Sequence, residues 1–316
     1  MMALQSLRVS QTDENHLMVA EFAEKARRFR TVAKVQESGP RTMRWFTVVR
    51  NLSMTIAAAI RIVPACWLLV GSPAVADEAL DSLVAAYPEQ LSSYDDRHLI
   101  WKDGTHQVSS DGRSNKTFEE LLSHPSIVDQ FEIPYRLGSQ ATLPSLNEDP
   151  GRIRNEEFFT RMYGDCRKGE VAAQLRPVRW LPHRGGGTVM ATRVNGIAEK
   201  LEQISIELEK LPPSITRYAV PSSGVYSCRK VAASNLISMH SYGAAIDIND
   251  KLGDYWLWNQ RRDGTLVRRH SVPQEIVSVF EKFGFIWGGK WYHFDTFHFE
   301  YRPEIIEMAR RGWPRN

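Results

Sequence analysis

Apolar side chains recur every three or four positions over residues 194–211, which is the period of a helix with one buried face. The proline pair at 212–213 ends this pattern. The same period predicts shorter helices near residues 80–87, 118–122 and 273–283. These helices are separated by polar stretches rich in turn-forming residues, so the chain does not follow the pattern of a helical bundle.

Runs of β-branched and apolar residues predict several short strands between the helices. They cover residues 175–181 and 188–192, which are joined through three consecutive glycines, and residues 218–220. A strand-rich segment is expected to close the chain. Together with the helices, these strands predict an α+β domain over residues 156–316, with a small antiparallel sheet and flanking helices.

Three further segments are expected ahead of this domain. Residues 77–155 are predicted to form an irregular region with a hairpin, because turn-forming residues interrupt every apolar run. Residues 54–76 resemble a secretory signal, with Arg61 before a short apolar stretch and a small-x-small cleavage site at 74–76. The apolar stretch is shorter than the roughly 20 residues of a membrane span, so cleavage is favoured over a permanent anchor. Residues 1–53 are an extension that does not fit ahead of an export signal.

Composition and charge narrow the classes of function. The chain has 316 residues, 42% of them hydrophobic and 24% charged, so it can bury a sizeable core. Forty basic and 37 acidic residues give a formal net charge of +3 without a long basic run. This balance argues against a protein that holds nucleic acid through its phosphates. The three cysteines include no C-x-x-C pair, which argues against a cysteine zinc finger.

Export would leave Cys166 and Cys228 as the two cysteines of the mature chain. Two thiols can pair in an oxidising compartment. We therefore expect a Cys166–Cys228 disulfide, and two separate buried thiols are the alternative.

The first segment with candidate chemistry contains Ser238, His240 and Asp247. In a strand that starts after Gly243, Asp247 shares one face with the small Ala245, while the isoleucines between and beyond them face the core. A turn at Gly243 can fold His240 back over that face. The sequence therefore predicts that an imidazole and a carboxylate meet at a common point.

The second segment lies close to the C-terminus. Over residues 297–301, alternate aromatic side chains can form the buried face of a strand, which leaves His298 and Glu300 on the other face. Asp295 would join them only if a turn or bulge forms near Thr296. Two histidines and one aspartate form a ligand set that leaves the fourth position on zinc open, as in catalytic sites. A further aspartate can then accept a proton from water.

Each of these residues alone has an ordinary structural explanation, but the joint pattern resembles a known family. This is the zinc D-alanyl-D-alanine peptidases, with the related phage L-alanyl-D-glutamate endopeptidases and the hedgehog-like fold that they share. The family pattern S-x-H-x-x-G-x-A-x-D occurs over residues 238–247. An acidic residue three positions before a histidine, followed by an aromatic residue and glutamate, occurs over 295–300. The resemblance covers about residues 190–305.

The resemblance implies roles for individual residues. The implied ligands of one Zn²⁺ ion are His240, Asp247 and His298. Asp295 would be the general base, and Arg229 is the candidate for binding a carboxylate or the developing oxyanion. Ser238 and Glu300 would bind substrate or support the metal ligands.

The expected function is zinc-dependent hydrolysis of peptidoglycan stem peptides outside the cytoplasm, by a monomer that has no nucleic-acid partner. A D-alanyl-D-alanine carboxypeptidase is favoured, and an L-alanyl-D-glutamate endopeptidase would use the same metal motif. A serine DD-peptidase is an alternative because Ser227 and Lys230 fit S-x-x-K, although K-T-G and S-D-N motifs are absent. The last alternative is a non-catalytic zinc protein that binds the cell wall, but Asp295 is present.

Overall fold

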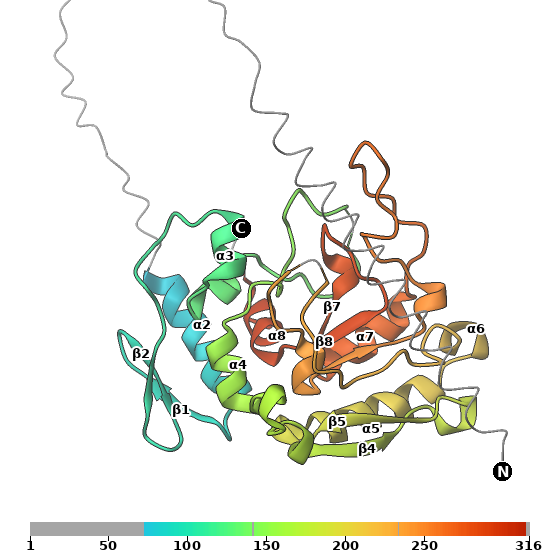
Figure 1. Cartoon of the computed structure of the whole chain (residues 1–316), viewed down its shortest axis with the longest axis horizontal. Coiled ribbons are helices and arrows are strands. Elements are labelled where there is room, and N and C mark those ends of the chain that lie inside the picture. Colours follow the sequence, from blue (N-terminus) through green and yellow to red (C-terminus); the bar gives the residue numbers. More distant parts are fainter. Residues whose placement is uncertain (1–72, 141, 233, 314–316) are drawn as a thin grey trace, which may run out of the picture. The chain divides into compact units, whose positions relative to one another are not determined.

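A computed structural model describes residues 73–140, 142–232 and 234–313 of the chain. These residues form small antiparallel sheets with helices around them. Figure 1 shows the course of the chain through these elements. All these residues belong to one unit, Leu69–Asn316. The arrangement confirms the predicted α+β class with small antiparallel sheets and flanking helices.

Most of the predicted export signal, and all of residues 1–53, lie outside the described residues. The helix α2 (Pro73–Ala86) includes the end of that signal, so the expected cleavage point after residue 76 falls within its first turns. No helix in the described ranges is both long and apolar enough to cross a membrane.

The region after α2 contains a meander of three antiparallel strands. They are β1 (Leu91–Tyr94), β2 (His98–Trp101) and β3 (His106–Val108), paired in that order. The predicted hairpin is therefore part of a three-stranded sheet. Helix α2 packs beside both β1 and the last helix, α8 (Pro303–Arg310), as Figure 1 shows for the two helices.

The predicted helix over 118–122 corresponds to α3 (Phe118–Ser123). Its start is fixed by a capping box, in which the Thr117 side chain accepts from the Glu120 backbone N–H and the Glu120 side chain accepts from the Thr117 backbone N–H. A second helix, α4 (Glu156–Tyr163), begins at Asn155, whose side chain accepts from the backbone N–H of Phe158.

The two predicted strands after α4 pair as an antiparallel hairpin of β4 (Leu175–Arg179) and β5 (Thr188–Thr192). The predicted long helix follows as α5 (Ile197–Glu209) and packs on this hairpin. It begins later than its apolar pattern because Asn195 has a positive φ of 55°, which separates residues 194–196 as a 3₁₀ turn.

The predicted strand at 218–220 is wrong. These residues form a turn after the short helix α6 (Pro213–Thr216). The side-chain amide of Asn249 donates to the carbonyls of Arg217 and Val220, at 2.9 and 2.8 Å. Because this amide uses carbonyls that a strand would offer to its neighbour, the apolar run packs as a turn.

The sheet that carries the candidate site has the order β6-β8-β7, with antiparallel pairing throughout. Its strands are β6 (Ala245–Asp247), β7 (Phe285–Trp287) and β8 (His298–Tyr301). The predicted helix over 273–283 corresponds to α7 (Gln274–Lys282), which packs against β7. Besides the expected strands, the closing segment contains helix α8, which starts with a proline in its first turn.

Residues from both sides of the expected boundary at 155/156 share one hydrophobic core. The ring of Tyr87 meets Phe158 and Tyr301 edge to face, with centroids 6.0 and 6.5 Å apart. Residues 149–151, at a turn ahead of α4, are also buried. The N-terminal region is therefore packed directly against the sheet that carries the candidate site.

Candidate metal centre

His240 lies in a single 3₁₀ turn, Met239–Tyr242, immediately before β6. The side chain of Ser238 caps this turn by accepting from the backbone N–H of His240. Gly243 ends it with a φ of +65°, and a Cβ at this position would lie 2.9 Å from a methyl group of Leu175. Only glycine satisfies both conditions, so this residue turns His240 back toward the strand that follows.

The three residues of the expected ligand set meet in the structure. The Nε2 atom of His240 lies 3.2 Å from both His298 Nδ1 and Asp247 Oδ1, which are themselves 2.9 Å apart. The pairing of β6 with β8 produces this meeting, because it places Asp247 directly opposite His298. All three side chains are largely buried.

The spacing of these donor atoms fits a zinc ion. Ligand atoms held about 2.0–2.1 Å from a tetrahedral zinc ion lie about 3.3 Å from one another. The three observed separations are close to this value, and two imidazole nitrogens with one carboxylate oxygen are ordinary zinc donors.

Each histidine is oriented through its other ring nitrogen. His240 Nδ1 lies 2.6 Å from the carbonyl oxygen of Val225, and His298 Nε2 lies 3.1 Å from Glu300 Oε2. Since a carbonyl and an ionised carboxylate only accept hydrogen bonds, these nitrogens carry the proton. In neutral rings, the nitrogens that face Asp247 are therefore the ones that offer lone pairs to a metal, and at His298 a bound cation would take the place of the proton that the raised pKa puts on Nδ1.

Glu300 is fully buried and is held by two arginines. Arg154 donates to both of its carboxylate oxygens, at 3.2 and 2.5 Å, and Arg302 donates to one of them at 3.4 Å. Burial opposes ionisation, but Arg154, the hydrogen bond from His298 and Arg302 outweigh it and hold the pKa of Glu300 below its usual range. Glu300 therefore supports the His298 ring as an ionised acceptor.

The donor set itself forms a strongly interacting charged group. Although burial opposes ionisation of Asp247, the two histidines lower the pKa of this carboxyl. Burial also opposes the charge on His298, but its hydrogen bonds with Asp247 and Glu300 raise the pKa of this ring to about 9. The arrangement thus concentrates negative charge around two imidazoles, as expected where a cation binds.

Asp295 lies beside this set, with one of its carboxylate oxygens buried. Burial and the neighbouring charge of Asp247 raise its pKa to about 7, although His298, Arg152 and Arg229 act in the opposite direction. Within the described part of the chain, its Oδ1 atom is buried without a hydrogen-bond partner. A carboxyl that titrates near neutral pH can both accept and release a proton.

A turn near Thr296 brings Asp295 close to the strand of His298. The backbone N–H of His298 donates to the Asp295 carbonyl at 3.2 Å, and the Asp295 N–H donates to the carbonyl of Gly288 at 3.0 Å. The Thr296 side chain accepts from the backbone N–H of Asp254 at 2.7 Å. The position of Asp295 is thus fixed by backbone contacts on both sides.

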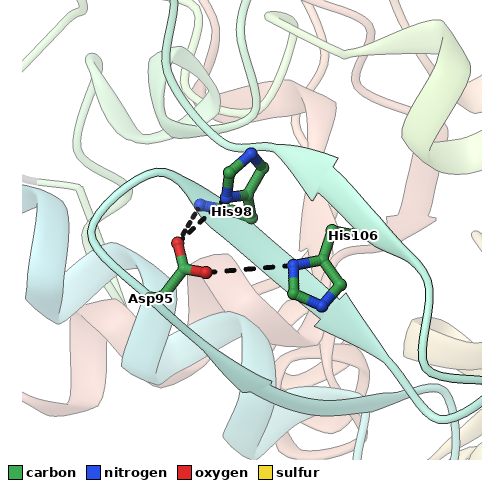
Figure 2. A group of neighbouring side chains, drawn as sticks. All are labelled: Asp95, His98 and His106. Atoms are coloured by element: carbon green, nitrogen blue, oxygen red, sulfur yellow. Dashed lines mark hydrogen bonds and ion pairs between the residues drawn. The ribbon is translucent and has the colours of Figure 1, made fainter.

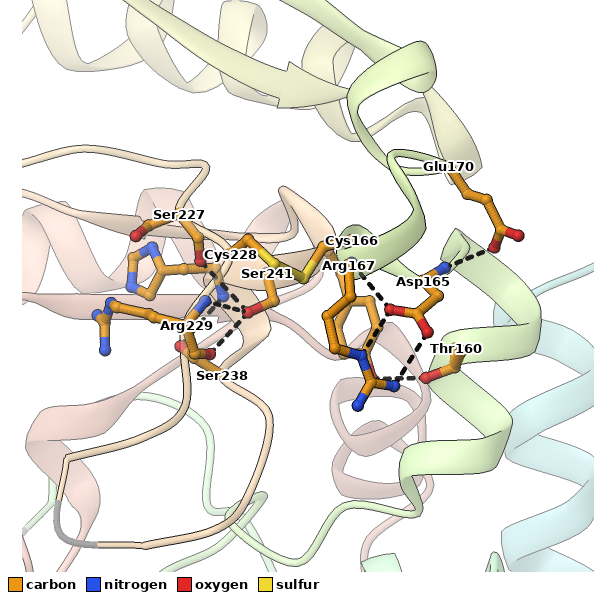
Figure 3. Close-up of a disulfide and its surroundings, with 12 residues drawn as sticks. Thr160, Asp165, Cys166, Arg167, Glu170, Ser227, Cys228, Arg229, Ser238 and Ser241 are labelled. Carbon is orange, nitrogen blue, oxygen red and sulfur yellow. Dashed lines mark hydrogen bonds and ion pairs between the residues drawn. A yellow bond between two sulfur atoms is a disulfide. The ribbon is translucent and has the colours of Figure 1, made fainter.

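Arg229 reaches the site from a segment that is tied down by a disulfide. Cys228 is bonded to Cys166, with an S–S distance of 2.06 Å, and Figure 3 shows Arg229 next to this bridge. The backbone N–H of Arg229 donates to Ser241 Oγ at 2.9 Å, and that hydroxyl donates to the Arg229 carbonyl at 2.7 Å. The Arg229 side chain is 45% exposed, and its Nη2 atom lies 3.9 Å from Asp247 Oδ2, at the edge of the donor set.

Two arginines that follow the buried turn at 149–151 belong to the site but were not predicted from the sequence. Arg154 binds Glu300, while Arg152 donates to the carbonyl of His293 at 3.1 Å and stacks over the ring of Trp291. The charge of Arg152 also lowers the pKa of Asp295. The only signal in the sequence is their alternate spacing, R-x-R, which is too short to indicate a distant partner.

Two histidines and an aspartate around one point, next to a carboxyl that is available for proton transfer, are typical of metal-dependent hydrolases. Residues 232–301 match a family model described as D-alanyl-D-alanine carboxypeptidase. This match supports the resemblance to the zinc D-alanyl-D-alanine metallopeptidases over that segment. Comparisons with curated proteins and with solved structures gave no match.

Proposed function

We propose that this protein is an exported zinc peptidase that removes the terminal D-alanine from peptidoglycan stem peptides. The observation that carries the proposal is the position of Asp295, which lies beside three metal donors, has a pKa near 7, and has a buried oxygen that lacks a partner among the described residues. A buried acceptor without a partner is costly in a purely structural setting. Substrate or water can supply its hydrogen bond.

The proposed ligands of the zinc ion are His240 Nε2, Asp247 Oδ1 and His298 Nδ1. When bound there, zinc supplies Lewis acidity, which polarises a peptide carbonyl and favours loss of a proton from water. Asp295 accepts the proton of the attacking water and delivers it to the leaving amine as the C–N bond breaks. Arg229 binds negative charge on the substrate, and Glu300 keeps the His298 ring in place.

The disulfide supports the proposed location. Disulfides persist mainly in oxidising compartments, and the Cys166–Cys228 bridge joins two segments of the described chain. Together with the signal-like segment 54–76, it favours an exported protein, and we propose that this protein acts on the cell wall as a monomer.

The alternatives differ in what they require of the site. An L-alanyl-D-glutamate endopeptidase would use the same metal donors and the same base. A serine mechanism would need Lys230 to activate Ser227, but Lys230 Nζ lies 3.3 Å from Asn235 Oδ1, at the exposed surface. A non-catalytic wall-binding protein would have no use for a carboxyl like Asp295.

The test is product analysis by mass spectrometry after the full chain is incubated with a muropeptide that carries a pentapeptide stem. Loss of one terminal alanine, abolished by a chelator and restored by Zn²⁺, would support the carboxypeptidase. A cut next to the first alanine would replace it with the endopeptidase. An intact stem in the presence of bound zinc would favour a binding protein, and labelling of Ser227 by a β-lactam would favour the serine mechanism.

A further inference from the structure

A second group of possible metal donors lies far along the sequence from the proposed peptidase centre, on the sheet β1-β2-β3. It consists of Asp95, His98 and His106, whose side chains point toward one another in Figure 2. One donor atom from each residue lies within 4.8 Å of one from each of the others. The group lies outside the segment 232–301 that matches the peptidase family.

The distances within the group centre on the carboxylate of Asp95. Its Oδ1 atom lies 3.1 Å from His98 Nδ1, and its Oδ2 atom lies 3.9 Å from His106 Nδ1. The two imidazole rings have centroids 5.6 Å apart and are inclined by 62°. The shorter separation matches the roughly 3.3 Å between ligands of a tetrahedral zinc ion, and rotation of the exposed His106 side chain can close the longer one.

The strands fix the histidines on one face. His106 pairs with Ile100, two residues along β2 from His98, so both imidazoles project to the same side. The opposite face is buried through Leu99, Trp101 and Gln107. Because burial of these residues fixes which face of the sheet is turned inward, both histidines lie on the face directed toward solvent.

The carboxylate is also held in place. Asp95 lies at the turn between β1 and β2, and its backbone N–H donates to the His98 carbonyl at 2.9 Å. Its Oδ1 atom accepts from the backbone N–H groups of Arg97 and His98, at 2.9 and 2.8 Å. Asp95 Oδ2 faces His106 and is not used by this turn.

We propose that Asp95, His98 and His106 form a second metal site, which binds a divalent transition-metal ion such as Zn²⁺. Two imidazole nitrogens and a carboxylate oxygen suit zinc and its neighbours in the first transition row better than calcium or magnesium. The three groups come from the β1–β2 turn, β2 and β3, so the bound ion links the whole sheet. The site does not depend on the proposed peptidase activity.

The test is a titration of the metal-stripped, untagged full chain with Zn²⁺ alone, followed by isothermal calorimetry. We expect two classes of binding sites in the unaltered protein. His106→Ala and Asp95→Asn should each weaken one class at least about tenfold and leave the other unchanged. His124→Ala, which removes another exposed histidine of the same region, is the matched control and should bind as the unaltered protein does.

A single class of sites that His106→Ala and Asp95→Asn both leave unchanged would overturn the proposal, whereas a single class that both variants weaken would support it and count against zinc binding at the peptidase centre. The proposal would also fail if a second class persists unchanged in both variants, because that class would then lie elsewhere in the chain. Circular dichroism checks that each variant is folded. His106→Ala should retain peptide hydrolysis, so loss of this site and failure of the proposed peptidase function are separate results.

Discussion

Arg154 and Glu300 form a buried ion pair across 146 residues of sequence. Glu300 also accepts the hydrogen bond that orients the ring of His298. The region that precedes the family motif thus reaches the proposed metal centre through one arginine and one glutamate. This contact gives residues 73–155 a role in the site, although the family match does not include them.

Replacing Arg154 with methionine should weaken zinc binding by about 10–100-fold, because the residue that orients a ligand loses its charged partner. It should also destabilise the fold by up to about 3–5 kcal/mol, since a buried carboxylate loses one of its two arginines. Calorimetric zinc titration and denaturant unfolding measure the two effects.

Arg161→Met is the matched control for this change, because Arg161 lies on α4, just after Arg154, but pairs with the exposed Asp103. Its effect on zinc binding should be negligible. If Arg154→Met lowers stability but leaves zinc affinity intact, the ion pair is structural only.

Two donors could be predicted from the sequence because they are local, whereas the third, His298, was joined to them by the family resemblance. His240, Gly243 and Asp247 lie within eight positions, and the alternation of a strand decides which of their neighbours are buried. By contrast, Arg152 and Arg154 act on residues more than 140 positions away, and no local period reports such a contact. The strand predicted at 218–220 failed for the same reason, since Asn249 lies far from it in sequence.

Asp295→Asn should retain the zinc ion but lower kcat by about 10²–10⁴-fold, because an amide cannot accept the proton that the proposed base takes from water. Metal content and turnover of a pentapeptide stem measure these two properties. His240→Ala should lose both, since it removes a metal donor. An Asp295→Asn enzyme of normal activity would exclude the proposed base.

The Cys166–Cys228 disulfide closes a chain segment of 62 residues. Replacing both cysteines with serine should lower the free energy of unfolding by about 2–5 kcal/mol, since the unfolded chain regains freedom. Because Arg229 follows Cys228, KM should rise more than kcat falls. Unfolding in denaturant and steady-state kinetics measure the changes, and an unaltered KM would mean that Ser241 alone positions Arg229.

Arg229→Gln should raise KM about 10–100-fold for a peptide with a free C-terminal carboxylate, which is the range expected for loss of a charge-assisted hydrogen bond. The same peptide with an amidated C-terminus should show little change, because it has no carboxylate to bind. Lys230→Gln controls for the loss of a neighbouring positive charge. An equal fall in kcat for both peptides would instead assign Arg229 to the developing oxyanion.

Asp254 holds together the two ends of the loop over residues 254–270. The contribution of its carboxylate to stability can be tested by changing the pH. Its buried carboxylate accepts from the backbone N–H groups of Arg269 and His270 and from the side-chain amide of Asn259 at 2.7 Å. Burial opposes ionisation, but these hydrogen bonds outweigh it and lower the pKa of Asp254. Asp254→Asn should therefore lower the free energy of unfolding at pH 7 by about 1–3 kcal/mol.

The sign of the pH effect follows from the lowered pKa. Above the unfolded-state pKa of about 3.9, the carboxylate is ionised in both states and contributes its full stabilisation. As pH falls through the lower folded-state pKa, that contribution is lost. The difference in free energy of unfolding between the unaltered protein and Asp254→Asn should thus become smaller in acid. Denaturant unfolding at several pH values measures it. Asp263→Asn, at an exposed position of the same loop, should change the free energy of unfolding by less. If the loss of unfolding free energy in Asp254→Asn stays constant with pH, the anchoring role of Asp254 is contradicted.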